Sequence, residues 1–582
     1  MRNIIYYILI VICLFYFSPF IQNNNVKAAF IEQVVIHSKA ISLGNAVTAY
    51  PPGIMAIHYN PAGLSDVREG IVISQGLSLG IIDRTDTFDP EPDFHFGQES
   101  SNFYAVNDPV AYQSNKTEDS RIYVPFYGKA DFPIMFSPLP FGISSRPEHS
   151  KWTFAYAIYS PFAWGEANDE DSPIRFQNKS NYLQHLIYAS PSFSYQVSDR
   201  LSLGFSIGFG QTALGMERDL RSPSEVTALL KEIDLEGGIL LDYTDIIGPF
   251  DSIGNMDIKL RDDLIYPPSF NFGVLWKPIR WLSIGVVYQS PIRSDLKGDY
   301  QFTYTNGFVS SMRSINNNNI EAMKAIFLTK NKIVENGFSK TRQIYNGPID
   351  LDNLAKNLSS LTLGYESGSA EVENFEFPER VQIGFLLRPF KKLRLMLDLH
   401  YENWSMKQYT VRFDHPIQAL KLASIINPTL ATNTLIYRKD SGENWHMSVG
   451  MEYQLKECLA LRAGYENRKT NANEKFFDTF SLPDIHFFGT GIGLKLRDGV
   501  ELDLAMAYMV NSGYIIENQQ SYNLNYLLPT KQSIPGDILQ TINPLLNPYT
   551  GQNVETKIEA YILSGNITIP FETMYELLDT IF

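Results

Sequence analysis

Residues 201–210 read LSLGFSIGFG, a stretch in which every odd-numbered position is large and apolar and every even-numbered position is Ser or Gly. Alternation with a period of two predicts a β-strand that has one apolar face and one face of small residues. The same period recurs at 282–289, 393–402, 459–465 and 500–508. These runs predict a protein built from β-strands.

The lengths and spacings of such runs favour a membrane barrel. Many reach about nine to eleven residues, which a tilted strand needs to cross a bilayer, whereas soluble strands usually have about five or six. Short and long connections alternate, as is typical of outer-membrane barrels with short periplasmic turns. The strands are predicted at 70–84, 121–136, 151–166, 182–197, 200–216, 257–277, 281–303, 376–389, 393–412, 445–456, 458–470, 485–496, 499–514 and 554–571. The short turns lie at 198–200, 277–280, 390–392, 456–457 and 497–498, and the long connections at 85–120, 217–256, 304–372 and 515–553.

The predicted fold class is therefore all-β: a transmembrane antiparallel β-barrel of about 14 strands. We expect its apolar faces to point outward to lipid and its polar faces to enclose the lumen. A soluble secreted β-sandwich that acts as a binding protein stays open, because it also has strands with one apolar face. With 48 basic and 63 acidic residues and no basic patch, the chain gives no reason to expect a nucleic-acid partner.

The N-terminus predicts export. Arg2 precedes an almost wholly apolar run at 4–20, and Val26-Lys27-Ala28 offers small residues for cleavage. We expect residues 1–28 to be a signal peptide; an uncleaved membrane anchor is the alternative. Cleavage would leave Cys458 as the only cysteine, so neither an intramolecular disulfide nor a cysteine metal site is expected.

Two of the long connections carry helix signals. Ser222-Pro223-Ser224-Glu225 has the pattern of a helix N-cap followed by proline and a capping-box glutamate. Apolar residues at helical spacing then suggest either a shared ligand groove above the barrel or packing within the loops themselves. The candidate groove residues are Val226, Leu229, Leu230, Ile233, Ile320, Met323 and Phe327.

No catalytic constellation is found, so an enzyme is not expected. The Gly-x-Ser-x-Gly patterns at 76–80 and 204–208 lie inside strand patterns, whereas a nucleophile elbow needs a sharp strand-to-helix turn. The nine histidines show no paired metal spacing. We therefore expect neither a metal nor a cofactor.

Charged residues on the predicted inner faces cluster near the short turns. Arg394, Arg462 and Lys495 each lie within a few residues of one, so they should meet in the periplasmic half of the lumen. Asp503 on a neighbouring strand could pair with them. We interpret this set as a lumen charge network that holds a structural element in place, with direct ligand binding as the second interpretation.

Pro161 interrupts the predicted third strand, and Gly165 follows it. Proline cannot donate to the ladder and is confined to strand edges, ends and bulges. A closed barrel has no edge, so this strand must bulge, end early or leave a gap in the wall.

Several motifs, taken in order, resemble the FadL/TodX (OmpP1) family of outer-membrane transporters for hydrophobic compounds. Each is moderately specific, but together they span nearly the whole mature chain. They are Gly44-Asn45-Ala46, Tyr59-Asn60-Pro61-Ala62-Gly63-Leu64, PSFSY at 191–195 with LSLG at 201–204, LSIGVVYQSPIRSDLKG at 282–298, FPERV at 377–381, Trp404-Ser405, LRAGYENRKT at 461–470, Leu482-Pro483-Asp484 and the run 554–571.

The resemblance implies a fourteen-stranded barrel plugged by an N-terminal hatch. The hatch would span 29–66, the barrel 67–571, and a C-terminal periplasmic tail 572–582. The stretch HYNPAGLS at 58–65, with Asn60, Pro61 and Ala62 as its motif, would be a compact turn inside the lumen that ends the hatch. An ordinary turn outside the barrel is the alternative.

It also implies a passive channel in the bacterial outer membrane. Family members capture hydrophobic molecules between extracellular loops, pass them to a lumen pocket, and release them sideways at an inward-kinked third strand, where Pro161 and Gly165 fall. The expected partners are long-chain fatty acids or hydrocarbons and the lipid of the outer membrane, and we expect a monomer. A secretion-system accessory barrel of the same family is the alternative.

Overall fold

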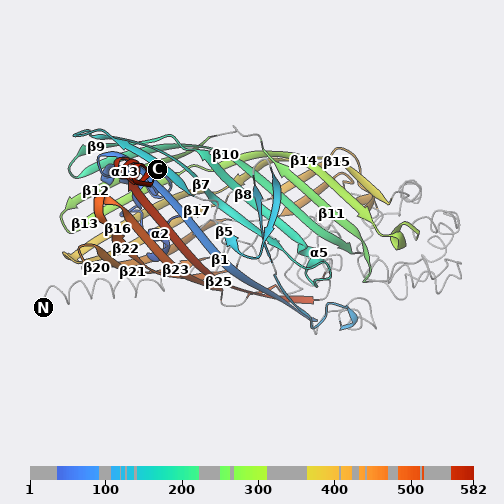
Figure 1. Ribbon diagram of the computed structural model, residues 1–582. Coiled ribbons are helices and arrows are strands. Elements are labelled where there is room, and N and C mark those ends of the chain that lie inside the picture. The colour runs from blue at the N-terminus through green and yellow to red at the C-terminus, as the bar shows by residue number, and fades with distance from the viewer. Residues whose placement is uncertain are drawn as a thin grey trace, which may run out of the picture.

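The computed structural model describes residues 36–90, 106–117, 119–124, 127–136, 140–221, 250–262, 268–310, 364–404, 408–421, 431–438, 442–469, 483–511, 514–516, 549 and 552–581. Within these residues, 25 strand segments form one antiparallel sheet that closes into a 14-strand barrel (Figure 1). Closure joins β1 (Gly70–Pro90) to β25 (Gln552–Pro570) in continuous register from Val72↔Pro570 to Pro90↔Gln552. The predicted fold class is confirmed, and a soluble sandwich is excluded.

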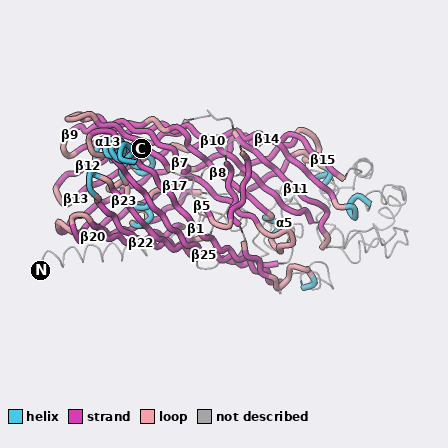
Figure 2. The backbone as a smooth tube through the Cα atoms, viewed as in Figure 1, coloured by secondary structure: helices cyan, strands magenta, loops and turns pink. Residues whose placement is uncertain are grey.

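The other strand segments lie between β1 and β25 in the sequence, most of them in the wall, with few helical turns (Figure 2). They are β2 (Ser114–Lys116), β3 (Asp119–Val124), β4 (Gly128–Phe132), β5 (Met135–Phe136), β6 (Phe141–Arg146), β7 (Trp152–Ala167), β8 (Ser180–Ala189), β9 (Ser192–Ser198), β10 (Leu201–Arg221), β11 (Ser252–Arg261), β12 (Ser269–Ile279), β13 (Leu282–Gln289), β14 (Ile292–Tyr304), β15 (Tyr365–Phe377), β16 (Glu379–Phe390), β17 (Leu393–Asn403), β18 (Gln408–Phe413), β19 (Thr434–Arg438), β20 (Glu443–Lys456), β21 (Leu459–Arg468), β22 (Ile485–Lys495), β23 (Glu501–Asn511) and β24 (Tyr514–Ile516). The helices are α2 (Ser38–Ser42), η2 (Gly53–Met55), α3 (Ala56–Tyr59), η3 (Pro61–Asp66), α5 (Arg175–Asn178), η6 (Arg497–Gly499) and α13 (Phe571–Ile581).

The short turns lie together at one end of the barrel, beside α13 and the C-terminus (Figure 1). Only two residues separate β9 from β10, β12 from β13, β16 from β17 and β20 from β21, and the sequence predicts short turns at these places. Outer-membrane barrels carry their short turns at the periplasmic end, so we call this the periplasmic end. No helix among the described residues is long and apolar enough to cross a membrane.

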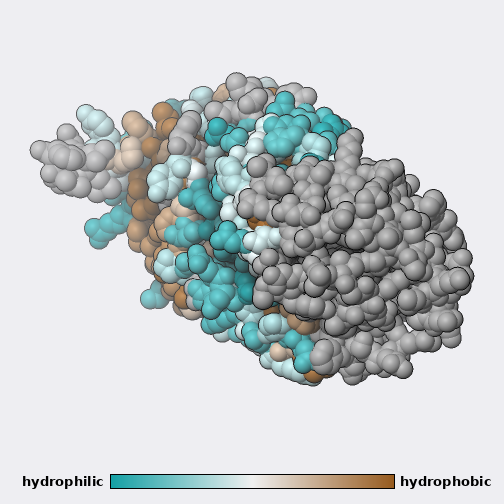
Figure 3. All heavy atoms as spheres, turned by 90° about the vertical axis from the view of Figure 1, so that its right-hand side faces the viewer, coloured by the Kyte–Doolittle hydropathy of each residue, from teal (hydrophilic) through white to brown (hydrophobic). Residues whose placement is uncertain are grey.

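In the periplasmic half of the wall, apolar side chains point outward. Phe154, Phe272, Trp276, Trp445 and Leu563 belong to a set of large apolar side chains that are exposed on the barrel surface. Figure 3, seen from the opposite end, shows a hydrophobic band around the distant part of the molecule. An exposed apolar belt of this kind is what a bilayer solvates. The predicted outward orientation is thus confirmed for this half.

The other half of the wall reverses this polarity. Along β14, Leu296, Tyr300 and Phe302 are buried inside the barrel. Arg293 and Lys297, at alternate positions of the same strand, are exposed outside. Figure 3 shows the corresponding hydrophilic surface nearer the viewer. The expectation that apolar faces point outward along whole strands is therefore wrong for this half, because these strands extend beyond the bilayer and their outer face meets water.

The switch of the apolar face from the outside to the lumen side can be followed within one continuous strand. Along β10, the apolar residues from Leu201 to Phe209 occupy odd, outward positions, whereas Leu214 and Met216 occupy even, lumen positions. The strand continues without a break, so the apolar residues change phase while the backbone does not. The lumen thus has small and polar residues at its periplasmic end and apolar residues beyond.

The predicted second strand, 121–136, is wrong as a wall strand. Its first part forms a β3–β4 hairpin that packs on the outer surface, where the Tyr123 ring stacks on Tyr182 at 5.8 Å between centroids. Tyr123 also accepts a hydrogen bond from Arg261 at 3.1 Å. The wall position is taken by β6, which pairs with β1 and β7. Polar partners on the outer face, such as Glu217 beside Arg121, explain why the hairpin leaves the wall.

Residues 36–67, which we call the lumen segment, fill the periplasmic half of the barrel. Its short helices carry apolar residues that are almost completely buried, including Ile41, Leu43, Ile57 and Leu64. Strands on several sides of the barrel contact it, among them β10, β12, β21, β22 and β23. The segment therefore lies within the wall, which rules out HYNPAGLS as a turn outside the barrel.

Wall glycines make room for this segment. A Cβ built on Gly464 would lie 2.0 Å from the backbone carbon of Leu43 and 2.1 Å from the nitrogen of Gly44. Equivalent clashes with backbone atoms of the lumen segment would occur at Gly204, Gly285 and Gly489. Since backbone atoms cannot move aside like a flexible side chain, these positions require glycine.

Gly464→Ala is expected to displace the lumen segment. Overpacking of this kind typically costs about 1–3 kcal/mol, so the folded barrel should unfold at a lower temperature in detergent, as measured by heat-dependent gel mobility. Gly565→Ala is the matched control, because its Cβ would meet only Leu504 Cδ2 at 3.5 Å, an ordinary contact. Equal unfolding temperatures for both variants would contradict the close-packing argument.

Candidate functional site

Asn60 anchors the end of the lumen segment. Its Nδ2 donates to the carbonyl of Thr48 at 2.8 Å and to that of Val274 in β12 at 3.1 Å, and its Oδ1 accepts from the Ala62 N–H at 3.1 Å. Pro61 begins η3, for which Asn60 is the N-cap. The predicted motif residues Asn60, Pro61 and Ala62 thus form one compact turn held against the wall.

A charge network lies at the periplasmic end of the lumen segment. Glu452 accepts from Arg394 at 2.6 Å and from Arg462 at 2.8 Å, and Arg462 also pairs with Asp503. Tyr50 of the lumen segment donates to Glu452 at 3.2 Å. Arg394, Arg462 and Asp503 therefore meet around Glu452, a residue that the sequence analysis did not single out, and they contact the segment.

Lys495 does not join this network. Its side chain is 69% exposed and lies 3.8 Å from Glu501, at the last residue of β22. The prediction placed it in the lumen because it is on the inward phase of the strand. At the end of the strand, however, an inward-facing side chain lies below the lumen segment and contacts solvent. The prediction is therefore wrong for Lys495.

A polar recess lies where the lumen segment meets the wall. It has a volume of about 280 Å³, open space included, and is lined by Asn45, Tyr59, Arg380, Gln382, His400, Glu466 and Arg468. Its two arginines are paired: Arg380 Nη2 lies 3.1 Å from Glu402, and Arg468 Nε lies 3.0 Å from Glu466. Acids and bases are thus balanced around the recess.

An apolar lining continues from there toward the loop end of the barrel. Phe162 and Phe377 stack with their ring centroids 4.4 Å apart, and Tyr409 and Tyr437 stack at 4.8 Å. They belong to one large cluster of buried apolar residues contributed by strands from β7 to β25. This half of the barrel therefore has an apolar interior.

The wall is interrupted beside β7. On one side of that strand, β6 pairs up to Phe141↔Ile158, and β3 pairs only at Ser120↔Glu166 and Asp119↔Ala167. Between these points, among the residues that the structure describes, β7 is paired only with β8. Over residues 159–165, β7 thus has one ladder instead of two within the described part of the chain.

Pro161 lies in a bulge at this interruption. Tyr159 pairs with Ile187 and Phe162 with His185, so two residues of β7 face one of β8. Ser160 caps the bulge by donating to the carbonyl of His185 at 2.7 Å. Of the three outcomes that the sequence leaves open, the structure shows a bulge together with a local gap in the pairing. Gly165 follows it, and its Cβ would lie 1.9 Å from the Arg121 carbonyl oxygen.

A buried ion cluster bridges β1 and β7 at the far edge of the interruption. Arg84 lies 3.1 Å from Asp86 and 3.2 Å from Glu166. Trp164 donates to Glu166 at 2.9 Å, and Asn178 does so at 2.8 Å. These side chains join the two strands where backbone pairing between neighbours is interrupted.

The seven candidate groove residues lie outside the described residues, so their prediction stays untested: Val226, Leu229, Leu230, Ile233, Ile320, Met323 and Phe327. The sequence analysis missed the recess, because its polar residues come from four separate segments. The available signal was the strand phase, which places Arg380, His400 and Glu466 on lumen faces.

A closed barrel with an outward apolar belt, a filled periplasmic half and an apolar lumen beyond defines an outer-membrane transport protein rather than an enzyme. The family described as "Outer membrane protein transport protein (OMPP1/FadL/TodX)" matches residues 27–568. The chain therefore belongs to this family, and its place is the bacterial outer membrane.

Solved structures share the fold. A Pseudomonas aeruginosa FadL homologue aligns with a TM-score of 0.60 and 15% identity, covering 93% of this chain and 100% of its own. The Pseudomonas putida toluene transporter TodX aligns with a TM-score of 0.55 and 13% identity, covering 94% and 100%. The Ralstonia pickettii toluene transporter TbuX aligns with a TM-score of 0.51 and 13% identity, covering 93% and 98%. No curated protein sequence matches the chain.

Acid is expected to weaken the docking of the lumen segment through His37. As N-cap of α2, its Nδ1 accepts the Lys39 N–H at 3.1 Å, which requires a neutral ring. Burial lowers the pKa of His37 from 6.5 to about 4. A released segment would take up this proton near pH 6.5, so docking should weaken as the pH falls from 6.5 toward 4.

We predict that protease access to the lumen segment increases over this pH range in outer-membrane vesicles. His37→Asn keeps an N-cap acceptor without a titrating ring, so this variant should show a flatter profile. Identical pH profiles for the two proteins would contradict a role for His37.

Proposed function

We propose that this protein is a passive channel for the uptake of long-chain fatty acids or other hydrophobic compounds across the outer membrane. The observation that carries the proposal is the interrupted wall at residues 159–165 of β7, next to an apolar lumen whose periplasmic end is filled. Transport of toluene by two structural relatives, TodX and TbuX, supports a hydrophobic ligand.

The proposed route starts at the loops and ends in the bilayer. Residues of the long loops, including the predicted groove, capture the ligand, and the apolar lining receives it. The ligand leaves sideways at the bulge of Pro161 and Gly165 and enters the lipid. An apolar molecule prefers this exit because transfer into an apolar medium gains about 25 cal/mol per Å² of surface removed from water. A concentration gradient is then sufficient to drive uptake.

In this proposal the lumen segment acts as the hatch. The proposed division is a signal peptide at 1–28, a hatch at 29–66, a barrel at 67–571 and a periplasmic tail at 572–582. The charge network around Glu452 holds the hatch from below, and the wall glycines fit its backbone. A monomer suffices, because the whole proposed route lies within one barrel.

Deleting Pro161 should abolish uptake while the barrel still folds. The bulge has one extra residue on β7, so its removal restores regular pairing with β8 and keeps Tyr159 and Phe162 on the lumen side. Because a bulge bends its strand, the deletion should also straighten β7 so that it can pair with its other neighbour and close the interruption. We expect cells that carry the deletion to lose uptake of radiolabelled oleate and toluene, while the purified protein still binds them.

Pro161→Ala is the matched control. It keeps the residue count and therefore the bulge, so uptake should stay close to that of the unmodified protein. Normal uptake by the deletion variant, with its folding verified by heat-dependent gel mobility, would refute sideways release at this point.

A further inference from the structure

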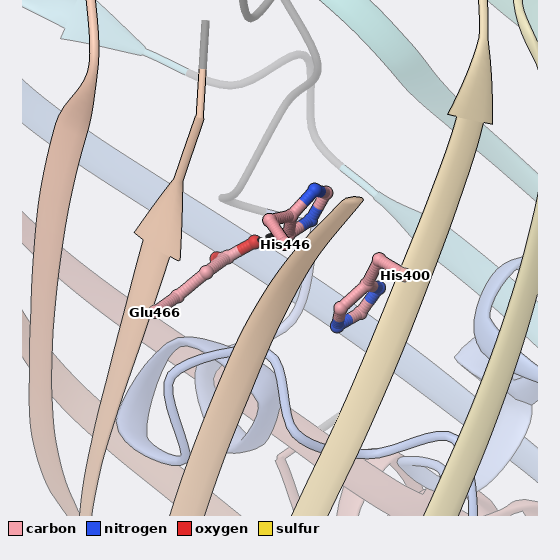
Figure 4. A group of neighbouring side chains, drawn as sticks. All are labelled: His400, His446 and Glu466. Carbon is pink, nitrogen blue, oxygen red and sulfur yellow. Dashed lines mark ion pairs between the residues drawn. The ribbon is translucent and has the colours of Figure 1, made fainter. Parts of the chain in front are cut away.

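Three side chains that commonly bind metals converge on the wall above the lumen segment. His400 of β17 pairs directly with His446 of β20, and their rings stack at 4.5 Å with an interplanar angle of 6°. Glu466 of β21 places Oε1 3.3 Å from Nε2 of His446 (Figure 4). One ligand atom from each residue lies within 4.8 Å of the others.

The contacts around this cluster satisfy its electron-pair donors only in part. Nε2 of His446 and Oε1 of Glu466 are buried and make no well-directed hydrogen bond, although Oε1 lies 3.3 Å from Nε2 of His446 and 3.0 Å from Nε of Arg468. Oδ1 of Asn45 on the lumen segment is also buried without a hydrogen bond. The two wall side chains are 4% and 1% exposed. A buried polar atom that lacks its partner costs about 1–3 kcal/mol. A bound cation would satisfy such atoms, because all three can offer a lone pair.

We propose that His400, His446 and Glu466 form a binding site for a divalent transition-metal ion of the Zn²⁺ type. Two imidazoles and one carboxylate are a ligand set that zinc accepts, with a fourth position open to water or another ligand. This inference does not depend on the proposed route of hydrophobic compounds.

The surroundings of His400 prepare it to ligate. Its Nε2 lies 2.5 Å from Oγ of Ser448, and the tautomer that donates there carries a lone pair on Nδ1. A hydrogen bond at the other ring nitrogen is the usual support of a metal-bound histidine. Tetrahedral zinc sets its ligand atoms about 3.4 Å apart. Side-chain rotations that move the ligand atoms by about 1 Å would bring them to this spacing.

Arg468 competes with the metal. Its Nε lies 3.0 Å from Oε1 of Glu466, the atom that would ligate the ion. A dication can bind only if this guanidinium moves aside, which weakens binding. Removal of its charge should therefore strengthen metal binding, whereas loss of a metal ligand should weaken it. A site that merely collects cations at the surface would not show these opposite effects.

An occupied site would also tie the wall to the lumen segment. Oε2 of Glu466 accepts a hydrogen bond from Nδ2 of Asn45 at 2.7 Å. Three wall strands and the lumen segment would then share one ion, and its open coordination position would face the polar recess, which both His400 and Glu466 line.

The test is Zn²⁺ titration of the full-length mature protein, purified in detergent and stripped with EDTA. We expect one Zn²⁺ per chain, measured by calorimetry and by metal analysis after dialysis. Glu466→Gln and His446→Gln should each weaken binding about tenfold or more, and Arg468→Gln should tighten it by a similar factor. His486→Gln is the control, because this histidine of β22 contacts Tyr465 at 2.8 Å and lies outside the cluster.

Absence of stoichiometric Zn²⁺ binding would overturn the proposal, and so would unchanged affinity in Glu466→Gln and His446→Gln. Should these variants fail to fold, Co²⁺ added to the unmodified protein provides a second measurement. The intense visible absorption of tetrahedral Co²⁺, displaced by Zn²⁺, is expected; a spectrum of hexa-aquo Co²⁺ alone would refute the site.

Discussion

The structure depends on the contact between the lumen segment and the glycines of the wall. At Gly204, Gly285, Gly464 and Gly489, the backbone of the segment lies where a Cβ would otherwise be. Packing at this distance leaves no lateral freedom, and the Asn60 turn and the Glu452 network fix the segment further. Because the periplasmic half of the lumen is filled in this way, the proposed route leads through the wall and not past the lumen segment.

The distribution of apolar residues also points to the interruption of the wall beside β7. Outside the barrel they form a belt in the periplasmic half, and inside it they line the other half. On the proposed route, a ligand in the apolar lumen would reach the bulge at Ser160–Pro161 near the level where the two regions meet. There, within the described part of the chain, β7 lacks one of its two ladders, and the Arg84–Glu166 pair joins β1 to β7 at the edge of the gap. The interruption thus lies between an apolar interior and an apolar exterior, where the proposal puts sideways release.

Much of this architecture follows from local sequence. The alternation at 201–210 predicts a wall strand, short turns predict the periplasmic end, and Pro161 predicts a defect in the third strand. What could not be predicted depends on residues far apart in the chain. The β3–β4 hairpin has alternating residues, yet it packs outside because of partners such as Tyr182 and Glu217. His400, His446 and Glu466 meet only through strand register, and Gly464 needs glycine only because Leu43 lies against it.

The central claim, that the lumen segment stays in place while ligands leave through the wall, can be tested by tethering both ends of the segment. Oγ of Ser38 lies 2.8 Å from Oγ of Ser564, and Oγ of Ser65 lies 2.9 Å from Oγ of Ser202, so cysteine pairs at these positions are close enough for disulfides. In a Cys458→Ser background, uptake of a radiolabelled hydrophobic ligand is compared before and after oxidation. We expect the doubly tethered protein to transport as fast as its reduced form. Loss of uptake on oxidation, restored by a reductant, would contradict the account.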